Sequence, residues 1–302
     1  MTTIALDSLR QRSPKPEWLK VKAPGSENYL RLRRLMREQQ LNTVCEEAHC
    51  PNIGECWHHG TATFMILGDV CTRACGYCAV AHGKPNELDL AEPARVADAA
   101  DAMDLRYVVI TSVDRDDLKD GGAGIFASTI REIRTRRPEC RIEVLIPDFQ
   151  GKPEPLHAVL DAGPDVLNHN TETVPRLYRK ARSGGRYPRT LELLDRARTH
   201  APHIPTKSGI MVGLGEEWDE IVQVLADLRG VGVQILTIGQ YLRPSEKHLP
   251  MTRYYTPAEF RQLKDIALGL GFGHVESGPL VRSSYHAHEQ ADALTGLRVH
   301  PA

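Results

Sequence analysis

Six of the seven cysteines of this chain fall between residues 45 and 78, in two groups of three. The first group is spaced C-x4-C-x5-C in VCEEAHCPNIGEC, and the second is spaced C-x3-C-x2-C in GDVCTRACGYC. Thiolates bind soft or borderline metals, chiefly zinc and the irons of iron-sulfur clusters. Each group is one ligand short of the four that structural zinc and [4Fe-4S] clusters usually take. The spacing therefore predicts metal chemistry at two incomplete sites.

The compartment in which the chain works decides how clustered cysteines are interpreted. The N-terminus has no apolar run of signal-peptide length, and no stretch reaches the roughly 20 apolar residues that span a bilayer. We therefore expect a cytoplasmic protein, in which clustered cysteines are metal ligands more often than disulfides. The remaining cysteine, Cys140, stands alone before an apolar run, and we expect it to be a buried structural thiol.

The spacing alone leaves two kinds of metal site open. Zinc needs a fourth ligand in each group, which His58, His59 or His82 would supply. A [4Fe-4S] cluster held by three cysteines instead keeps one iron open to a ligand from outside the protein. The place of each group in the fold bears on this choice.

Short β-rich runs alternate with amphipathic stretches from residue 61 onward. The runs are TATFMILG (61–68), RYVVITS (106–112), RIEVLIPD (141–148), DVLNHN (165–170), IPTKSGIMVG (204–213) and QILTIGQYL (234–242). Apolar residues at i, i+3, i+4 and i+7 predict helices over stretches that include 92–104, 124–137, 190–200, 217–230 and 256–271. Six successive βα units with right-handed crossovers predict an α/β fold, a partial (β/α)6 barrel of the TIM type.

In such barrels the active site collects at the C-terminal ends of the strands. The first strand leads into the group Cys71, Cys75 and Cys78, the second into TSVDRDD, the third into Asp148 and the fourth into NHN. Polar residues also follow strands simply because loops are exposed, but that explanation does not extend to three cysteines. An incomplete three-cysteine site at this position suggests a cluster that binds and activates a small molecule.

The segments outside the barrel, and the overall charge, complete the outline. A helical stretch (28–40) precedes the first cysteine group, and a tail with a short helix follows residue 275. TPAE at 256–259 predicts a capped helix start, and DGGAG at 120–124, which lacks the lysine of a phosphate-binding loop, predicts a turn that begins a helix. The 38 basic and 39 acidic residues give a net charge of -1, which argues against nucleic-acid or membrane partners.

Long motifs along nearly the whole chain carry a resemblance to a known family. C-x3-C-x2-C with an aromatic residue, Tyr77, before its last cysteine resembles the radical S-adenosylmethionine superfamily. Together with the upstream C-x4-C-x5-C group, the chain resembles the lipoyl synthase family within it. The matching motifs are VCEEAHCPNIGECW, GTATFMILGDVCTRACGYCAVAHG, RYVVITSVDRDDLKDGGA, VLNHNTETVPRLY, PTKSGIMVGLGE, LTIGQYLRPSEKHLP and GPLVRSSYHA.

The resemblance implies two [4Fe-4S] clusters with different tasks. Cys71, Cys75 and Cys78 would hold the cluster that binds S-adenosylmethionine and cleaves it to a 5'-deoxyadenosyl radical. The residues Cys45, Cys50, Cys56 and Ser284 would hold an auxiliary cluster, with Ser283 the less favoured serine. The radical would abstract hydrogen from C6 and C8 of a protein-bound octanoyl chain, and the auxiliary cluster would give up the sulfur.

The resemblance also implies pocket residues, partners and boundaries. Residues expected near the cofactors are Tyr77, Ser112, Asp114, Arg115, Asn168, Asn170, Lys207, Glu216 and Arg282. Expected partners are octanoylated carrier domains (2-oxoacid dehydrogenase E2 subunits and the glycine cleavage H protein), a low-potential electron donor (ferredoxin or flavodoxin) and an iron-sulfur carrier that rebuilds the cluster. We expect an N-terminal extension over 1–60, the radical barrel over 61–280 and an RSSY tail over 281–302.

Two other functions stay open at this point. A sulfur-inserting enzyme of the biotin synthase type would share the barrel and one cysteine group, but is not expected to combine C-x4-C-x5-C with RSSY. A zinc-stabilised binding module or a ferredoxin-like electron carrier would have no open iron position.

Overall fold

A computed structural model of the chain describes residues 15–20, 25–39, 41–47, 50, 52–58 and 62–295. Within this part, eight strands form one sheet in the order β1-β2-β5-β6-β7-β8-β9-β10. β1 is antiparallel to β2, and all other neighbours are parallel. The strands are β1 (Asn42–Thr43), β2 (Ala62–Ile66), β5 (Tyr107–Ser112), β6 (Arg141–Leu145), β7 (Val166–Asn168), β8 (Thr206–Val212), β9 (Ile235–Gln240) and β10 (His274–Gly278).

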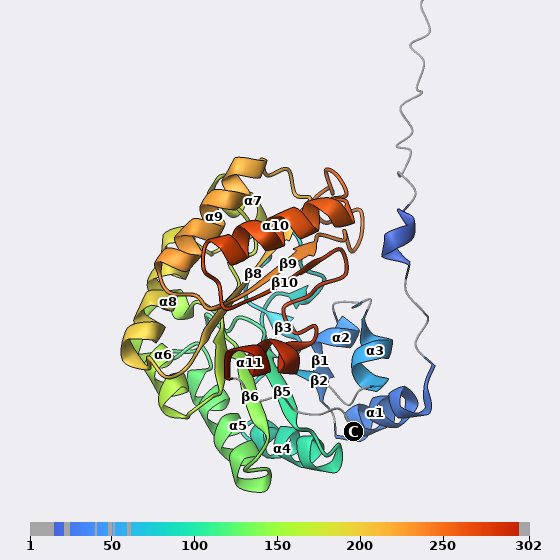
Figure 1. Cartoon of the computed structure of the whole chain (residues 1–302). Coiled ribbons are helices and arrows are strands. Elements are labelled where there is room, and N and C mark those ends of the chain that lie inside the picture. The colour runs from blue at the N-terminus through green and yellow to red at the C-terminus, as the bar shows by residue number, and fades with distance from the viewer. Residues whose placement is uncertain are drawn as a thin grey trace, which may run out of the picture.

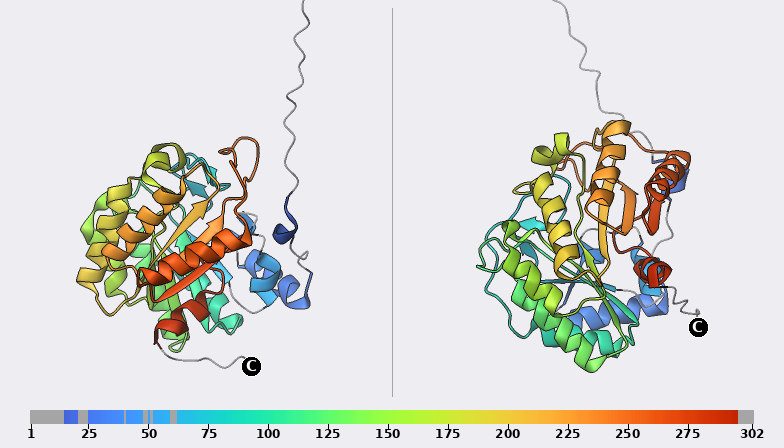
Figure 2. Two further views of the ribbon diagram at one scale, coloured as in Figure 1. Left: turned by 45° about the horizontal axis from the view of Figure 1, so that its top comes forward. Right: turned by 60° about the vertical axis from the view of Figure 1, so that its left-hand side comes forward.

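Helices cover the outer face of this curved sheet, as Figures 1 and 2 show. They are α4 (Glu92–Ala102), α5 (Ala123–Arg136), α6 (Pro153–Asp161), α7 (Pro175–Ala181), α8 (Tyr187–His200), α9 (Trp218–Gly230) and α10 (Pro257–Gly269). The flanking segments contribute α1 (Glu27–Glu38), α2 (Val44–Glu47), α3 (Ile53–His58) and α11 (Ala287–Thr295), and two 3-10 turns lie at Glu17–Leu19 and Phe149–Gly151. None of the described helices is long and apolar enough to cross a membrane.

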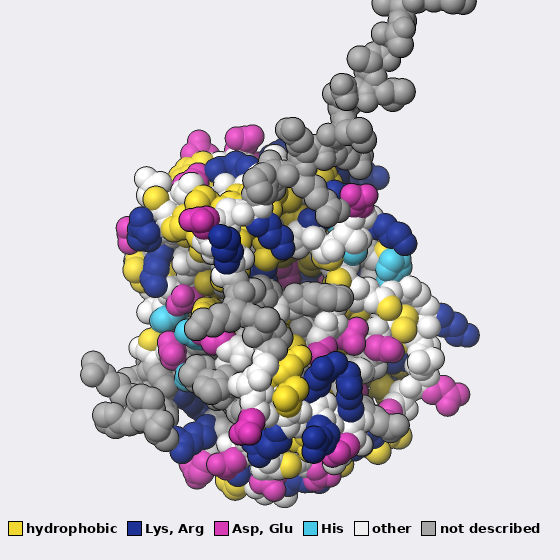
Figure 3. All heavy atoms as spheres, turned by 90° about the vertical axis from the view of Figure 1, so that its right-hand side faces the viewer, with side chains coloured by type: hydrophobic (Ala, Val, Ile, Leu, Met, Phe, Trp, Pro, Cys, Tyr) yellow, Lys and Arg dark blue, Asp and Glu magenta, His cyan; other side chains and the backbone are white. Residues whose placement is uncertain are grey.

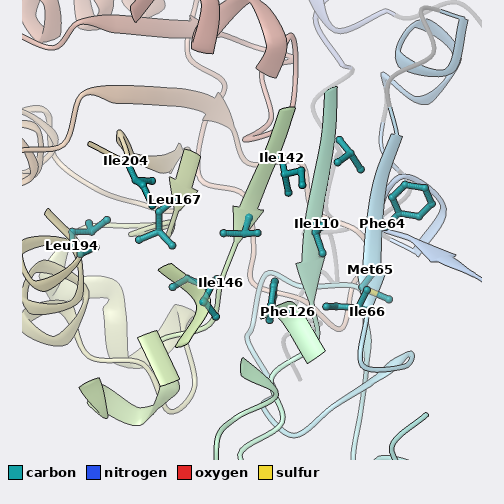
Figure 4. Packing of buried hydrophobic residues seen from close by; sticks show 14 of the residues in the cluster. Phe64, Met65, Ile66, Ile110, Phe126, Ile142, Ile146, Leu167, Leu194 and Ile204 are labelled. Atoms are coloured by element: carbon teal, nitrogen blue, oxygen red, sulfur yellow. The ribbon is translucent and has the colours of Figure 1, made fainter. Parts of the chain in front are cut away.

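The core fills the space between sheet and helices. All residues of β2 and β9 are buried, as expected for parallel strands covered on both faces. In Figure 4, Phe126 from α5 reaches the strand side chains Ile110 and Ile66, with which it belongs to one buried cluster. Cys140 is part of the same cluster at 2% exposure, so the expectation of a buried thiol is confirmed.

The two ends of the barrel differ, because α11 covers only one of them. Ala287 and Ala291 of α11 pack with Tyr107, Val166 and Ile235, which are the first residues of three strands. The short C-terminal helix expected from the sequence therefore closes the N-terminal end of the strands. The cysteine loop follows β2 and lies at the opposite end.

The sequence expectations for the barrel are confirmed, with one addition. All six expected strands are present, α10 begins with a capping box formed by Thr256 and Glu259, and Gly122 at φ 87° makes the turn before α5. A further parallel strand, β10, extends the barrel where the sequence predicts only a tail. Only Val275 of that strand is buried, so no apolar alternation marks it. The helical pattern of apolar residues also did not predict α6, because this helix has only nine residues, two of which are prolines.

Candidate functional site

The second cysteine group lies on a loop that is closed at its base. This loop leaves β2 and is bounded by two short parallel strands, β3 (Val70–Cys71) and β4 (Ala81–His82). The Gly83 amide donates to the Cys71 carbonyl oxygen at 2.9 Å, and the Cys78 amide donates to that of Cys75 at 3.1 Å. Three half-buried thiols are thus held together by local backbone pairing.

Other parts of the chain fix the outside of this cysteine loop. The Gly76 amide donates to the Ala181 carbonyl oxygen at the end of α7 (2.9 Å), and the Gly76 carbonyl accepts from the Leu249 amide (2.8 Å). His248 Nε2 lies 2.9 Å from the Cys78 carbonyl oxygen, and its Nδ1 lies 2.8 Å from Ser245 Oγ. The loop after β9 therefore braces the cysteines, a role that the sequence analysis missed.

A small cavity of about 110 Å³ opens beside the cysteine loop. It brings together six of the residues expected from the sequence, namely Cys71, Cys75, Tyr77, Cys78, Ser112 and Asp114. The remaining lining comes from Met65, Arg73, Val80, His82 and Val113. The ends of β2 and β5 and the cysteine loop thus meet at one site.

The cysteine side chains suit a metal cluster better than free thiol chemistry. Burial, followed by the charge of Asp114, raises the pKa of Cys71 to about 11 and that of Cys75 to about 12. Burial also raises the pKa of Cys78. Without metal these thiols stay protonated at neutral pH, whereas a bound metal displaces the protons. The amides of Arg73 (3.4 Å) and Asp114 (3.3 Å) already point at Cys71 Sγ, as donors to a ligating sulfur would.

The geometry also bears on the zinc alternative. Among the described residues, no three side chains of His, Cys, Asp or Glu converge closely enough to hold a single metal ion. The described cysteines form no disulfide either. Ligands spread around one cavity suit a cluster of four irons, because cysteine sulfurs bound to different irons lie farther apart than the ligands of one ion. His82 lines the cavity but completes no tetrahedron, and His58 and His59 lie outside the described side chains.

Arg73, between the first two cysteines, organises the charges around the cavity. Its side chain is 5% exposed, and its guanidinium contacts carboxylates of Asp114 (3.4 Å), Asp116 (2.7 Å) and Asp148 (2.7 Å). Burial alone would raise the pKa of Asp148, but Arg73 and Arg189 outweigh it and hold that pKa well below its usual range. No sequence motif singles out Arg73, because its partners come from the ends of two different strands.

Residues after β7 form the wall behind Tyr77. Arg182 donates to the Asn170 carbonyl oxygen (2.6 Å) and lies 3.3 Å from His169 Nε2. Burial, reinforced by Arg182, lowers the pKa of His169 to about 3, so its ring is neutral. Asn170 Nδ2 in turn donates to Glu172 (3.1 Å). Arg182, His169 and Glu172 were missed because only the folded chain brings them beside the cysteine loop.

Several buried oxygen atoms here lack a hydrogen-bond partner among the described residues. They include Ser112 Oγ, Asn168 Oδ1 and Asn170 Oδ1. Buried polar atoms are nearly always paired in native proteins, so such atoms point to a polar ligand. Three residues expected near the cofactor therefore have free hydrogen-bonding capacity.

Lys207 is the second residue of β8 and does not line the cysteine cavity. Its side chain is fully buried. Its Nζ lies 2.9 Å from Glu143 Oε1, and Glu143 also accepts from Tyr107 (2.8 Å) and Asn168 (2.9 Å). Lys207 thus lies within the strand expected over residues 204–213, and its role near a cofactor stays a prediction.

Arg115 and Glu216 shape loops and do not line the cysteine cavity. Arg115 pairs with Asp117 at 2.9 Å and donates to the carbonyl oxygens of Leu67 and Asn86. Glu216 accepts from the amides of Gly213 (2.5 Å) and Leu214 (2.9 Å), which fixes the turn after β8. Both follow strand ends, as expected, and both are buried, but their polar atoms are already paired within the protein.

The first cysteine group meets the C-terminal tail, more than two hundred residues away. Asn52 Nδ2 donates to the Leu280 carbonyl oxygen at 2.7 Å, and Tyr285 Oη donates to Glu55 at 3.3 Å. The RSSY segment, with half-buried Ser284, is thereby anchored to the segment of Cys50 and Cys56. Cys45 lies in α2, but its side chain is outside the described part.

The electrostatics of this second site resemble those of the cysteine loop. Burial, followed by the neighbouring Cys50 and Glu55, raises the pKa of Cys56 to about 12, and burial raises that of Cys50. Arg282 lies near enough to Cys50 for their charges to interact, and its NH1 donates to the Val281 carbonyl oxygen (2.6 Å). On this face of the molecule acidic and basic side chains are interspersed (Figure 3).

Comparisons with known proteins agree with these observations. The sequence matches the Radical SAM superfamily over residues 65–228 and the N-terminal domain of lipoyl synthase over residues 5–50. Lipoyl synthase of Koribacter versatilis is 61% identical over 94% of this chain and 93% of that protein. Lipoyl synthase of Rubrobacter xylanophilus is 60% identical over 94% of this chain and 88% of that protein.

Solved structures support the fold at much lower sequence identity. Methylornithine synthase superposes with a TM-score of 0.54 over 83% of both chains, at 13% identity. HydG, a maturase of the [FeFe]-hydrogenase, superposes with a TM-score of 0.51 over 91% of this chain and 66% of that chain, at 14% identity.

Proposed function

Because this chain belongs to the lipoyl synthase family of radical SAM enzymes, we propose that its two cysteine groups divide the labour of one sulfur-insertion reaction. The enzyme inserts two sulfur atoms, at C6 and C8 of a protein-bound octanoyl-lysine, and so makes the lipoyl group. Its cofactors are S-adenosylmethionine and two [4Fe-4S] clusters. The roles of individual residues are our assignment.

Cys71, Cys75 and Cys78 are the ligands of the radical-generating cluster. The observation that carries this assignment is the cavity they share with Tyr77 and Asp114. A cluster held by these cysteines would supply the single low-potential electron that cleaves S-adenosylmethionine into methionine and a 5'-deoxyadenosyl radical.

The chain's own residues position and shield that reaction. Amides of Arg73 and Asp114 donate to the Cys71 sulfur, and the cysteine loop is braced by α7 and by the segment after β9. The unpaired oxygens of Ser112 and Asn170 would be free to accept hydrogen bonds from a bound S-adenosylmethionine. Among the residues after β7 that lie behind Tyr77, His169 is neutral, so Arg182 supplies the positive charge.

Cys45, Cys50, Cys56 and Ser284 are the ligands of the auxiliary cluster. That cluster is the source of both sulfur atoms. The contacts of Asn52 and Glu55 with the tail support this assignment, because they hold the RSSY segment against the cysteines. A serine oxygen is a harder and weaker ligand for iron than a thiolate, which favours release of the iron it holds. Ser284 is favoured over Ser283, and Arg282 stays beside Cys50.

Family membership implies a lipoyl-carrier protein as substrate and a reductant for the radical cluster. As particular partners we propose octanoylated E2 domains or the glycine cleavage H protein, ferredoxin or flavodoxin, and an iron-sulfur carrier that restores the auxiliary cluster. We place the reaction in the cytoplasm, where reducing conditions preserve the thiols.

The proposal is tested by anaerobic incubation of the reconstituted protein with S-adenosylmethionine, a reductant and an octanoylated carrier-domain peptide. Mass spectrometry should detect a product that carries two added sulfur atoms, and two 5'-deoxyadenosines should form for each product. If protein with full iron and sulfide content left the octanoyl peptide unchanged, the substrate assignment would be overturned.

A further inference from the structure

A second cavity, of about 510 Å³, lies between α7 and the start of α8. Its lining consists of Arg179, Arg182 and Arg186 together with two tyrosines, two prolines and two glycines, and it includes no acidic residue. The chain as a whole has a net charge of -1, so this concentration of positive charge is local. The cavity is not part of the site assigned above, although Arg182 contacts both.

The positive charges of this cavity are not neutralised by the described part of the chain. Arg179 and Arg186 are exposed, and within that part neither side chain forms an ion pair or a hydrogen bond. Other arginines on the helices do have carboxylate partners, as Arg136 has Asp98 and Arg253 has Glu259. Two adjacent unpaired guanidinium groups repel one another, which an acidic partner would relieve.

The cavity lies beside the cysteine loop, at the open end of the barrel. The end of α7 is hydrogen-bonded to that loop through Ala181 and Gly76. Gly184 lies against Arg73, where a Cβ atom would meet Cδ at 3.2 Å. Arg176, in the first turn of α7, pairs with Glu220 at the start of α9, so the cavity is at the end where the strands finish. A molecule bound there sits next to the mouth of the radical site.

We propose that this arginine-lined cavity is the docking site for an acidic face of the octanoylated carrier domain. The inference rests on the proposed function, in which the octanoyl-lysine arm enters the barrel while the folded carrier stays outside. Arg179 and Arg186 pair with carboxylates of the carrier, and Tyr178 and Tyr187 provide the apolar floor between them. Charge pairs of this kind mainly set encounter rate and specificity, so they act on KM more than on turnover.

The test uses the full-length reconstituted enzyme and the double variant Arg179→Glu/Arg186→Glu. Binding to an octanoylated carrier domain is measured anaerobically by fluorescence anisotropy, and turnover is measured with that domain and with a short uncharged octanoyl-lysyl peptide. We expect the Kd and KM for the carrier domain to rise about tenfold, because two exposed charge pairs become repulsive. The rise should be larger at low salt, where these charges are less screened. Turnover of the short peptide and 5'-deoxyadenosine formation should not change.

The double variant Arg106→Glu/Arg131→Glu is the matched control, because both are exposed arginines and neither lines either cavity. It carries the same charge change as the test variant and should leave the Kd and KM for the carrier domain as they are. An unchanged carrier Kd in the test variant would overturn the docking assignment. So would a loss of turnover with the short peptide as large as the loss with the carrier domain. If the test variant kept its affinity for the carrier but no longer bound inorganic phosphate, the cavity would be assigned to a small anion instead. Tight carrier binding without any sulfur insertion would contradict the proposed function alone.

Discussion

The two cysteine groups of this chain are built in opposite ways. Cys71, Cys75 and Cys78 lie within eight residues of one another on a loop closed by β3 and β4. The segment of Cys50 and Cys56 is instead held against a distant tail, and the contact between Asn52 and Leu280 spans 228 positions. A locally closed loop is preorganised for a permanent cofactor, whereas a site closed by a distant tail can open without unfolding the barrel. That difference suits one cluster that is kept and one that is consumed.

The largest expected effect is the loss of the permanent site. In Cys75→Ala, formation of 5'-deoxyadenosine should fall at least about 100-fold, because losing a ligand costs more than losing an outer partner of one. Iron should fall from about eight to about four per chain, counted colorimetrically after anaerobic reconstitution.

Cys140→Ala is the control for this change, since Cys140 is a buried thiol away from both sites. It should retain the full iron content and both products. Equal iron loss in the two variants would remove the distinction between structural and ligating cysteines.

The next effect concerns the charges that support the cysteine loop. Arg73→Met leaves the carboxylates of Asp114, Asp116 and Asp148 without their shared cation, and we expect a loss of about 3 kcal/mol in the free energy of unfolding. Urea denaturation measures it. The comparison variant Arg136→Met breaks an exposed pair and should cost less than about 1 kcal/mol. A similar cost for both would mean that the buried network adds nothing.

A smaller and more selective effect is expected at the anchor of the tail. Asn52→Ala leaves the Leu280 carbonyl oxygen without its donor and should cost about 1 to 2 kcal/mol. Sulfur insertion should decline while 5'-deoxyadenosine formation continues, both followed by mass spectrometry. Gln223→Ala, which removes an exposed amide bonded to Asp227, is the control. A parallel decline of both products in Asn52→Ala would argue against a separately docked tail.

The smallest effect is expected far from both sites. Thr256→Ala removes the N-cap of α10 and should lower the free energy of unfolding by about 1 kcal/mol. Neither product should change at 25 °C, and thermal unfolding gives the stability difference. If sulfur insertion alone fell, the helix layer would be coupled to the auxiliary site, and the two regions would not be independent.

Most of the barrel could be predicted from the sequence, because buried strands and amphipathic helices have strong periodic patterns. β10 could not, since a strand with only Val275 buried has no pattern to recognise. The cysteine loop was equally predictable, as its ligands are local. The strand that holds Lys207 was predictable too, but its buried partner Glu143 was not, because that residue comes from a different strand.

Contacts between distant segments set the limit of sequence reasoning at the sites. Arg73 meets Asp148 only because two strands end side by side, and His248 meets the cysteine loop across 170 positions. Nothing in the composition of RSSY indicates iron, so Ser284 was expected only through family resemblance. The arginine-lined cavity shows no motif at all, because its charge depends on which neighbours fail to pair.

The central claim is that one cluster generates the radical and the other supplies the sulfur. It is tested most directly with Cys50→Ala, reconstituted anaerobically with isotopically heavy sulfide and given S-adenosylmethionine, reductant and an octanoylated carrier-domain peptide. The account predicts that 5'-deoxyadenosine is formed and that no heavy sulfur enters the peptide, whereas the unchanged protein delivers two heavy sulfur atoms. Heavy sulfur in the peptide made by Cys50→Ala would contradict the division between the two sites.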